Sequence, residues 1–322
     1  MEASRDELTY EPLLEREGVR VSRSPWGPDD VIGRLNWITP AGSLELLART
    51  GGGRIFDLSV DYFMGMPSFQ AFGDPPYQIS MTHTPGGTVT DDASGLGPEV
   101  HRKYSYCGDA VSMYTHLGTH IDTLVHLGYF DHYWNGLNAE EHLGSRCWST
   151  GGADRYPPLI ARGVVLDVAA LHGVDRIPDD TVVGPGDLRG AAGRQGLELR
   201  RGDIVLVRTG KMQVWPDPAY LDMPMPGIDL AAARFLCEEA GAMIVGADTA
   251  ALEAFPGREE GYAPVHCYMF ATAGTPILEV VNLEELAAEG VDEFVFVGMP
   301  LPLRGATGSP LRPIAIPLAP GA

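Results

Sequence analysis

The chain has 322 residues, a formal net charge of −20 at neutral pH, 44% hydrophobic residues and 20% charged residues. This length and apolar content are enough for a packed core, which excludes an intrinsically disordered chain. A surface this acidic repels phosphate backbones and anionic lipids, so nucleic acids and membranes are not expected partners.

The cysteines and the first residues bear on the cellular compartment. Four cysteines are spread along the chain without a CxxC pair, at positions 107, 147, 237 and 267. This distribution is typical of buried thiols in a reducing compartment. The charged start, MEASRDELTYEPLLEREG, lacks the apolar core of a signal peptide. The sequence therefore predicts a cytoplasmic protein.

In chain order, the sequence predicts an N-terminal arm over residues 1–25 and a single domain over residues 26–322. The domain begins with a turn at WGPDD, a short helix near 41–49 and a strand in RIFDLSVDY. Residues 65–97 are rich in Gly, Pro and Thr and predict a long loop, either a lid or a plain surface excursion. A strand at DAVSMYTH follows it.

The second half alternates short apolar runs with helices. A helix over 230–241 is expected to begin at the cap Asp229 and end at Gly241, and a shorter one to run from Asn282 to Gly290. Buried strands are predicted for four runs bounded by Gly or Asp, namely GVVLDVAAL, GDIVLVRTG, GAMIVGADT and DEFVFVGMPL. The pattern predicts a mixed α/β fold with more strands than helices.

Residues 114–128, YTHLGTHIDTLVHLG, place His116, His120, Asp122 and His126 within eleven positions. On a helix, His116 and His120 would share a face, but Asp122 would lie about 240° away from His116. On a straight strand all four side chains would share a face, but His116 and His120 would lie about 13 Å apart. Neither regular element brings these side chains to one ion.

A strand bent at Gly118 satisfies both conditions, because glycine tolerates unusual dihedrals and its missing side chain would leave space for an ion. His116, His120 and Asp122 would then offer two nitrogens and one oxygen, a set suited to Zn²⁺, Mn²⁺ or Fe²⁺. His126 lies further along the chain and is better placed to transfer a proton. The alternative is a polar patch in a turn, whose members only satisfy one another.

The pattern His-x-Gly-Thr-His-x-Asp-x-x-x-His at 116–126 resembles the signature of the metal-dependent cyclase-family hydrolases, which include bacterial kynurenine formamidase and isatin hydrolase. Leu124 stands where many members have proline, but WGPDD at 26–30 and YWNG at 133–136 are similar to a longer branch that tolerates an apolar residue there. Further similar blocks follow in the family's order, namely IFDLSVDYFMGMP, GDIVLVRTG, VGADT, PVHCYMFATAGTPILEVVNLEEL and LRGATGSPLRPIAI.

The resemblance implies a strand-rich, swivelling β/β/α-type single domain. It also implies roles: His116, His120 and Asp122 match metal ligands, and His126 matches the catalytic histidine. His266 and Glu279 match the residues that complete a second, carboxylate-bridged metal. Zn or Mn, and one or two ions per chain, remain open, as does the choice between a homodimer and a homotetramer. A neighbouring chain that partly closes the pocket is compatible with either assembly.

Without the resemblance, the sequence supports Glu279 as a metal ligand more strongly than His266. His266 stands beside apolar residues, so a buried histidine with an ordinary hydrogen-bond partner is the simpler interpretation without the resemblance. Glu279 lies within the apolar run PILEVVN, where a carboxylate is costly unless it is paired or bound to a metal.

A metal in such a site lowers the pKa of bound water to about 7 and stabilises an oxyanion, while His126 would carry the proton to the leaving group. We therefore expect hydrolysis of a small formamide, amide or lactam. Candidate substrate contacts are Phe72, Tyr133, Trp134 and Asn135, for which core packing or a subunit interface is an equally good explanation.

Three other functions use the same residues. One is a cyclase or dehydratase of aromatic, polyketide-like metabolism, and another is a lactone hydrolase. The third is a non-catalytic binding protein stabilised by a metal, against which His126 argues, because a purely structural site needs no outer histidine.

Overall fold

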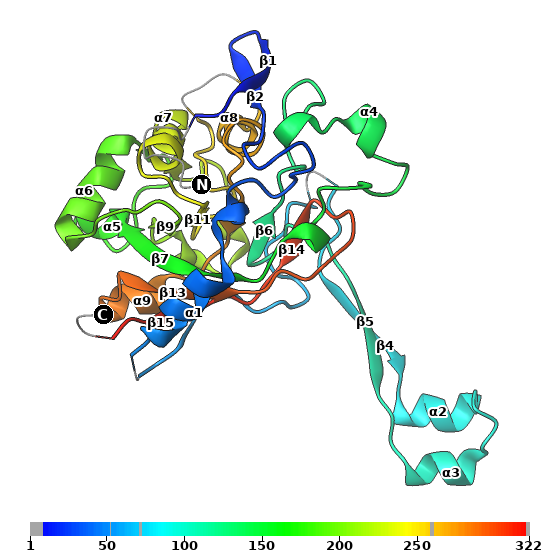
Figure 1. Cartoon of the computed structure of the whole chain (residues 1–322). Helices are drawn as coiled ribbons and strands as arrows, with labels where there is room; N and C mark the ends of the chain where they lie inside the picture. Colours follow the sequence, from blue (N-terminus) through cyan, green and yellow to red (C-terminus); the bar gives the residue numbers. More distant parts are fainter. Residues whose placement is uncertain (1–8, 52, 71–72, 258–260, 320–322) are drawn as a thin grey trace.

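The computed structural model describes residues 9–319 except 52, 71–72 and 258–260. Within these residues, nine strands form one mixed sheet in the order β14-β6-β12-β11-β9-β7-β13-β15-β3 (Figure 1). The four central strands are parallel: β12 (Ile277–Glu279), β11 (Ile244–Ala247), β9 (Ile204–Arg208) and β7 (Leu159–Asp167). The flanking strands pair antiparallel and comprise β14 (Gly308–Pro310), β6 (His120–Asp122), β13 (Glu293–Gly298), β15 (Ile314–Pro317) and β3 (Phe56–Asp57).

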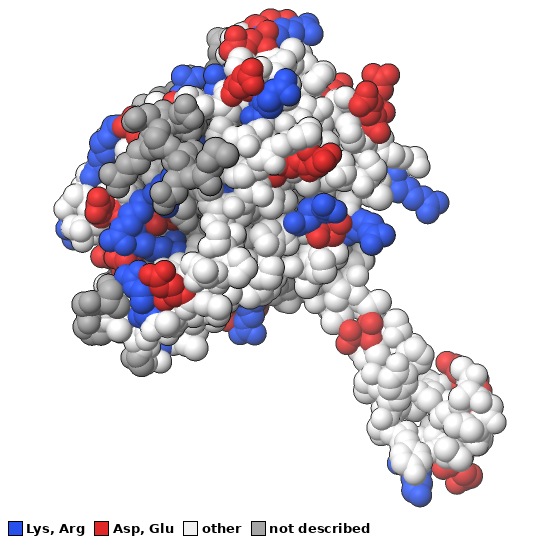
Figure 2. Space-filling model, viewed as in Figure 1, with Lys and Arg blue, Asp and Glu red and all other residues white. Residues whose placement is uncertain are grey.

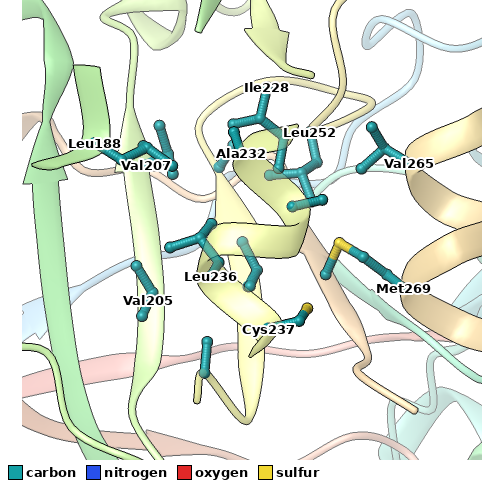
Figure 3. Close-up of a cluster of buried hydrophobic side chains, with 14 of the residues drawn as sticks. Leu188, Val205, Val207, Ile228, Ala232, Leu236, Cys237, Leu252, Val265 and Met269 are labelled. Atoms are coloured by element: carbon teal, nitrogen blue, oxygen red, sulfur yellow. The ribbon is translucent and has the colours of Figure 1, made fainter. Parts of the chain in front are cut away.

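The central strands are buried on both faces because their residues alternate between two hydrophobic clusters. Val205 and Val207 of β9 point to one cluster, which α5 (Val168–Leu171), α6 (Pro185–Gln195) and α7 (Leu230–Arg234) cover (Figure 3). Ile204 and Leu206 point to the other, which includes Leu286 of α9 (Glu284–Glu289). Burial of each such side chain contributes about 1.5–3 kcal/mol. The predicted α/β class is therefore confirmed, and a buried strand is present at each of the four predicted runs, although in GVVLDVAAL the strand ends at Asp167 and the last four residues form α5.

The predicted helices are present, with small shifts. Helix α1 spans Pro40–Ala48 after the cap Thr39. Asp229 caps α7 by accepting a hydrogen bond from the Ala232 amide, and a π-helical turn, Phe235–Glu239, continues the helix to Gly241. Helix α9 ends at Gly290 as predicted, but it starts one residue later than expected: the residue before it is Leu283, although the Asn282 side chain still accepts from the Glu284 amide.

Two other strand predictions are also too long. Only Phe56–Asp57 of the predicted strand at 54–62 pairs in the sheet, because the chain then turns toward Thr119, whose hydroxyl oxygen accepts a hydrogen bond from the Val60 amide. The strand predicted at 109–116 is β5 (Gly108–Ser112), which ends four residues before His116.

The prediction of a long loop over residues 65–97 is wrong for residues 78–91, which form a strand and a helix. Strand β4 (Gln78–His83) pairs antiparallel with β5, and the short helices α2 (Pro85–Asp91) and α3 (Pro98–Lys103) lie between them. Figure 1 shows this unit standing away from the body of the molecule, and we call residues 78–112 the projecting hairpin. The Pro and Gly residues mislead because Pro85 and Pro98 begin helices there.

The remaining elements are short. Strands β1 (Pro12–Arg16) and β2 (Val19–Ser22) form a hairpin inside the predicted N-terminal arm, while the arm's boundary at residue 25 stays a prediction. Strands β8 (Val182–Val183) and β10 (Gly227–Ile228) pair with each other, and α4 (Ala139–His142) and α8 (Pro264–Cys267) complete the fold. Among the described helices, none is long and apolar enough to cross a membrane.

All four cysteines are free thiols. Cys237 and Cys267 are buried as predicted, but Cys107 and Cys147 are exposed, so the prediction is wrong for these two. Cys107 lies on the projecting hairpin, which has no core in which to bury it.

Candidate metal centre

The predicted ligands meet at one edge of the sheet, where β6 lies between β12 and β14. The strand register places Glu279 of β12 beside His120, and Gly308 of β14 beside Asp122. Helix α8 brings in His266 from a separate part of the chain. The site therefore depends on the pairing of a three-residue strand with both of its neighbours.

The backbone bend at Gly118 is confirmed, but the space that we expected there is not. Gly118 has φ = +60°, and the chain turns just before β6 begins at His120. A Cβ at Gly118 would lie 2.8 Å from the ring of Tyr62 and 3.1 Å from Met66, so these side chains fill the gap instead of an ion. At Gly308 a Cβ would lie 2.5 Å from the His116 ring, so this glycine makes room for the ligand itself.

The donor atoms form two overlapping groups that share Asp122, one with His116 and His120, the other with His266 and Glu279. Nδ1 of His116 lies 2.5 Å from Oδ1 of Asp122, and Nε2 of His120 lies 3.3 Å from the same oxygen. Glu279 approaches Nε2 of His120 at 3.2 Å and Nε2 of His266 at 3.1 Å. All five residues are buried.

Each of the three histidines has its far nitrogen fixed. Nε2 of His116 meets the Thr307 hydroxyl at 2.9 Å, and Nδ1 of His120 meets the Gly118 carbonyl oxygen at 2.8 Å. Nδ1 of His266 contacts the carboxylate of Glu253. The other nitrogen of each ring therefore points at the shared carboxylates. Metal-binding histidines are held in this way, because the outer hydrogen bond fixes the tautomer and the ring orientation.

The residues fit a divalent cation. Nε2 of His120 and Oδ2 of Asp122 are buried without a hydrogen-bond partner, and each such atom costs about 1–3 kcal/mol. A cation between the rings and carboxylates would satisfy both atoms. Nitrogen and carboxylate oxygen together suit Zn²⁺ or Mn²⁺, so the donor set is that of a divalent metal centre.

The buried carboxylates also change how the ligands hold protons. Burial alone would lower the pKa of His120, but the nearby carboxylates of Asp122 and Glu279 outweigh it and raise this pKa to about 10. Burial opposes protonation of His266 too, and contacts with Glu253 and Glu279 raise its pKa well above the ordinary value. Without a cation, the cluster therefore holds protons in its place.

His126 lies outside both donor groups but touches one ligand. Its ring stacks on that of His116, with centroids 3.9 Å apart and planes inclined by 23°, and the edge of Phe270 lies nearby. Burial and the charge of the neighbouring histidines lower the pKa of His126 to about 3. The ring is therefore neutral at pH 7 and has a nitrogen free of a proton.

Glu253 belongs to the site but was not predicted from the sequence. This buried carboxylate accepts hydrogen bonds from the backbone amides of Val265 and His266, at 3.3 and 3.2 Å, in addition to its contact with the His266 ring. It thereby fixes both the start of α8 and the orientation of a ligand. The signal that could have found it is the one used for Glu279, a carboxylate among apolar residues.

The predicted substrate-binding residues after the motif have structural partners. Trp134 has no exposed surface, and its indole N–H donates to Oδ2 of Asp30 at 2.8 Å. The Asn135 amide donates to the carbonyl oxygens of Gly27, Pro28 and Asp30. Thus WGPDD and YWNG hold one another, and the structure places Trp134 in the core and not on a pocket wall.

Two further candidates differ from these. Tyr133 packs edge-on against Trp148, with centroids 4.8 Å apart, and Phe72 lies outside the described residues. Substrate contact therefore stays a prediction for both. Tyr114, which was not predicted from the sequence, contacts a ligand: the centroids of its ring and of the His116 ring lie 4.8 Å apart.

Residues 56–254 match the model of the cyclase family, described as "Putative cyclase". A crystal structure described as a novel cyclase is 30% identical, with a TM-score of 0.77, and the match covers 90% of this chain and 97% of that one. This chain belongs to the cyclase family, which confirms the resemblance found at residues 116–126.

Two isatin hydrolases A are also similar in structure. The one from Labrenzia aggregata, bound to benzyl benzoate, is 25% identical with a TM-score of 0.60, and the match covers 83% of this chain and 94% of that one. The one from Ralstonia solanacearum is 24% identical with a TM-score of 0.62, over 86% and 97% of the two chains. A search of curated proteins finds no match.

Proposed function

We propose that this protein is a metal-dependent hydrolase that cleaves the C–N bond of a small formamide, amide or lactam. The observation that carries the proposal is geometric: two buried donor groups share Asp122, and the ring of His126 stacks on that of the ligand His116. The likeness to isatin hydrolase A at 25% identity supports the same reaction class.

His116, His120, Asp122, His266 and Glu279 would hold the cation or cations. Because Asp122 belongs to both donor groups, the cluster has positions for one or two ions of Zn²⁺ or Mn²⁺. When bound, the cation supplies acidified water and stabilises negative charge on the substrate's carbonyl oxygen.

His126 would carry the proton. A ring nitrogen takes a proton from the attacking water as the C–O bond forms, then gives it to the departing nitrogen as the C–N bond breaks. The products are a carboxylate and an amine, or one amino acid where the substrate is a ring. Tyr114 lies beside the His116 ring and would contact a planar substrate held there.

Ring closure or dehydration is the second candidate, since the 30% identical structure is described as a cyclase. It would use the same residues without net addition of water. Lactone hydrolysis is a further variant, in which His126 protonates an alkoxide.

The test is to load the protein with Zn²⁺ or Mn²⁺ and to supply isatin, an N-formylated aromatic amine and a simple lactone. The expected result is release of acid from the amide substrates, measured by pH-stat and mass spectrometry. Protein stripped of metal and the His126→Ala variant serve as controls. Acid release that persists equally in both controls, or its absence with every amide, would overturn the proposal, and isomerisation without water uptake would establish the cyclase instead.

A further inference from the structure

Three buried residues have a backbone conformation that their side chains disfavour. Leu252, Ala263 and Val280 have φ between +50° and +54°, and each exposes at most 4% of its surface. In this conformation the Cβ atom lies too close to the following carbonyl oxygen. The other non-glycine residues with positive φ, within the described part of the chain, are at least partly exposed.

All three residues are neighbours of the metal centre along the chain. Leu252 precedes Glu253, and Val280 follows Glu279. Ala263 is the residue before α8, which carries His266. Strained backbone persists only where the surroundings over-determine it, and such residues cluster at functional sites. Other groups must therefore hold these residues in place.

For Val280 these groups can be identified. Its N–H donates to the carbonyl oxygen of Thr249 at 2.9 Å, and its own carbonyl oxygen accepts from the Thr119 hydroxyl at 2.7 Å. Strand β12 ends at Glu279, so neither hydrogen bond belongs to the strand pairing. A β-branched residue is a clear outlier at positive φ, and here both of its backbone polar groups are fixed.

The Thr119 hydroxyl is fully used in this arrangement. It donates its one proton to Val280 and accepts from the Val60 amide at 3.0 Å, so it needs both the donor and the acceptor capacity of a hydroxyl. Thr119 has no exposed surface, and its carbonyl oxygen accepts from the Tyr62 hydroxyl at 2.6 Å. The hydroxyl is therefore held from two sides and stays directed at Val280.

The residue held in this way follows a metal ligand. The Glu279 carboxylate lies 3.2 Å from Nε2 of His120 and 3.1 Å from Nε2 of His266. Strand β12 has only three residues and Glu279 is its last, so the backbone after it determines where the strand turns. A relaxation of Val280 to extended backbone would reorient the peptide that joins it to Glu279.

We propose that Thr119 is a positioning residue for the metal centre: its hydroxyl holds Val280 in the left-handed conformation and thereby aims the Glu279 carboxylate at the cation. This role rests on the metal centre of the proposed function and not on the reaction that it catalyses. Two adjacent residues thus divide the work, since His120 binds the ion and Thr119 fixes a ligand on the neighbouring strand.

The test compares substitutions that differ in one hydroxyl. Thr119→Val keeps the shape of the side chain but cannot hydrogen bond, so the affinity for Zn²⁺ or Mn²⁺ should fall about 10- to 100-fold, the usual loss when the support of a ligand is removed. Thr119→Ser keeps the hydroxyl and should restore wild-type affinity. Competition with a metallochromic chelator measures both.

Thr249→Val is the matched control. Thr249 is equally buried and contacts Val280, but only through its backbone, and its hydroxyl has no hydrogen-bond partner within the described residues. This variant should bind metal as the wild type does.

A double-mutant cycle with Val280→Gly separates positioning from general support of the fold. Glycine adopts positive φ without strain, so in this background Thr119→Val should weaken metal binding by less than about threefold. In the Val280→Ala background, which loses similar packing but keeps the Cβ atom, Thr119→Val should still be harmful. Val280→Gly should also have a higher Tm than Val280→Ala.

Two results would overturn the proposal alone: wild-type metal affinity in Thr119→Val, or an equal loss of affinity from Thr119→Val in the valine, alanine and glycine backgrounds. Circular dichroism establishes that each variant folds. Where Thr119→Val does not fold, a Val280→Gly variant no more stable than Val280→Ala is the contradicting result. A wild type that takes up no ion would overturn the proposed function as well, whereas one that binds metal but hydrolyses no amide would overturn only the hydrolysis.

Discussion

The metal centre and the projecting hairpin differ in how many contacts the rest of the described chain gives their side chains. At the centre every proposed ligand is buried, and three histidines have their outer nitrogens fixed by Thr307, Gly118 and Glu253. On the hairpin every residue of β4 is exposed. At the metal centre, two buried polar atoms still lack a hydrogen-bond partner, and a cation would satisfy them. On the hairpin, apolar side chains are exposed to solvent, and Figure 2 shows few charged side chains along its two strands. The groups left unsatisfied therefore differ in kind, polar atoms in one region and apolar surface in the other.

Removal of the shared carboxylate should have the largest effect at the centre. Asp122 belongs to both donor groups, so Asp122→Ala should abolish metal uptake and turnover together. Elemental analysis after dialysis against Zn²⁺ or Mn²⁺ measures the first, and acid release the second. A variant that retained stoichiometric metal would show that the cluster is not organised around this residue.

Removal of the proton carrier should separate chemistry from binding. His126→Ala leaves all five ligands in place, so metal content should equal that of the wild type while kcat falls by about 10²-fold or more. Steady-state kinetics on the metal-loaded protein provides the measurement. If the variant turned over at the wild-type rate, His126 would have no role in proton transfer.

Neutralising Glu253 should have a smaller effect, on affinity. Glu253→Gln keeps the shape of the side chain but removes the charge that holds Nδ1 of His266, so metal affinity should fall about 10- to 100-fold. Competition with a metallochromic chelator measures this change. Glu238→Gln, at a carboxylate that accepts a hydrogen bond from the Tyr268 hydroxyl, is the matched control and should bind metal normally.

The smallest expected effect is a dependence of stability on pH without metal. The pKa of His120 is raised from 6.5 to about 10 by Asp122 and Glu279, against the effect of burial. Its contribution to stability is therefore complete below about pH 6.5 and decreases as the pH rises to about 10. The Tm of metal-free protein should fall over this range, and bound metal should suppress the fall. Equal slopes with and without metal would contradict the assigned protonation.

The sequence predicts the features that depend on neighbouring residues. Runs such as IVLVR at 204–208 predict buried strands because apolar β-branched residues pack on both faces of a sheet. The spacing of His116, His120 and Asp122, together with a glycine between them, similarly predicts a bent backbone. These conclusions need only local geometry.

Features that depend on distant residues were missed or misjudged. The space at Gly118 is filled by Tyr62, which lies far away in the sequence. The role of Glu253 follows only from its contact with His266, which lies in another element. The hairpin was predicted as a loop because Pro and Gly occur at helix starts as well as in turns. Trp134 and Asn135 seemed placed for a ligand, but their partners lie near the start of the chain.

The position of β14 also bears on the order of events during synthesis. Strand β6 is paired with Gly308–Pro310 on one side, and the hydroxyl of Thr307 holds the ring of His116. A slip of one residue in such a short strand would turn His120 and Asp122 to the opposite face. The centre therefore cannot assemble while its earliest histidines emerge from the ribosome. The full ligand set also needs His266 of α8 and Glu279 of β12, so it can form only after nearly the whole polypeptide has been translated.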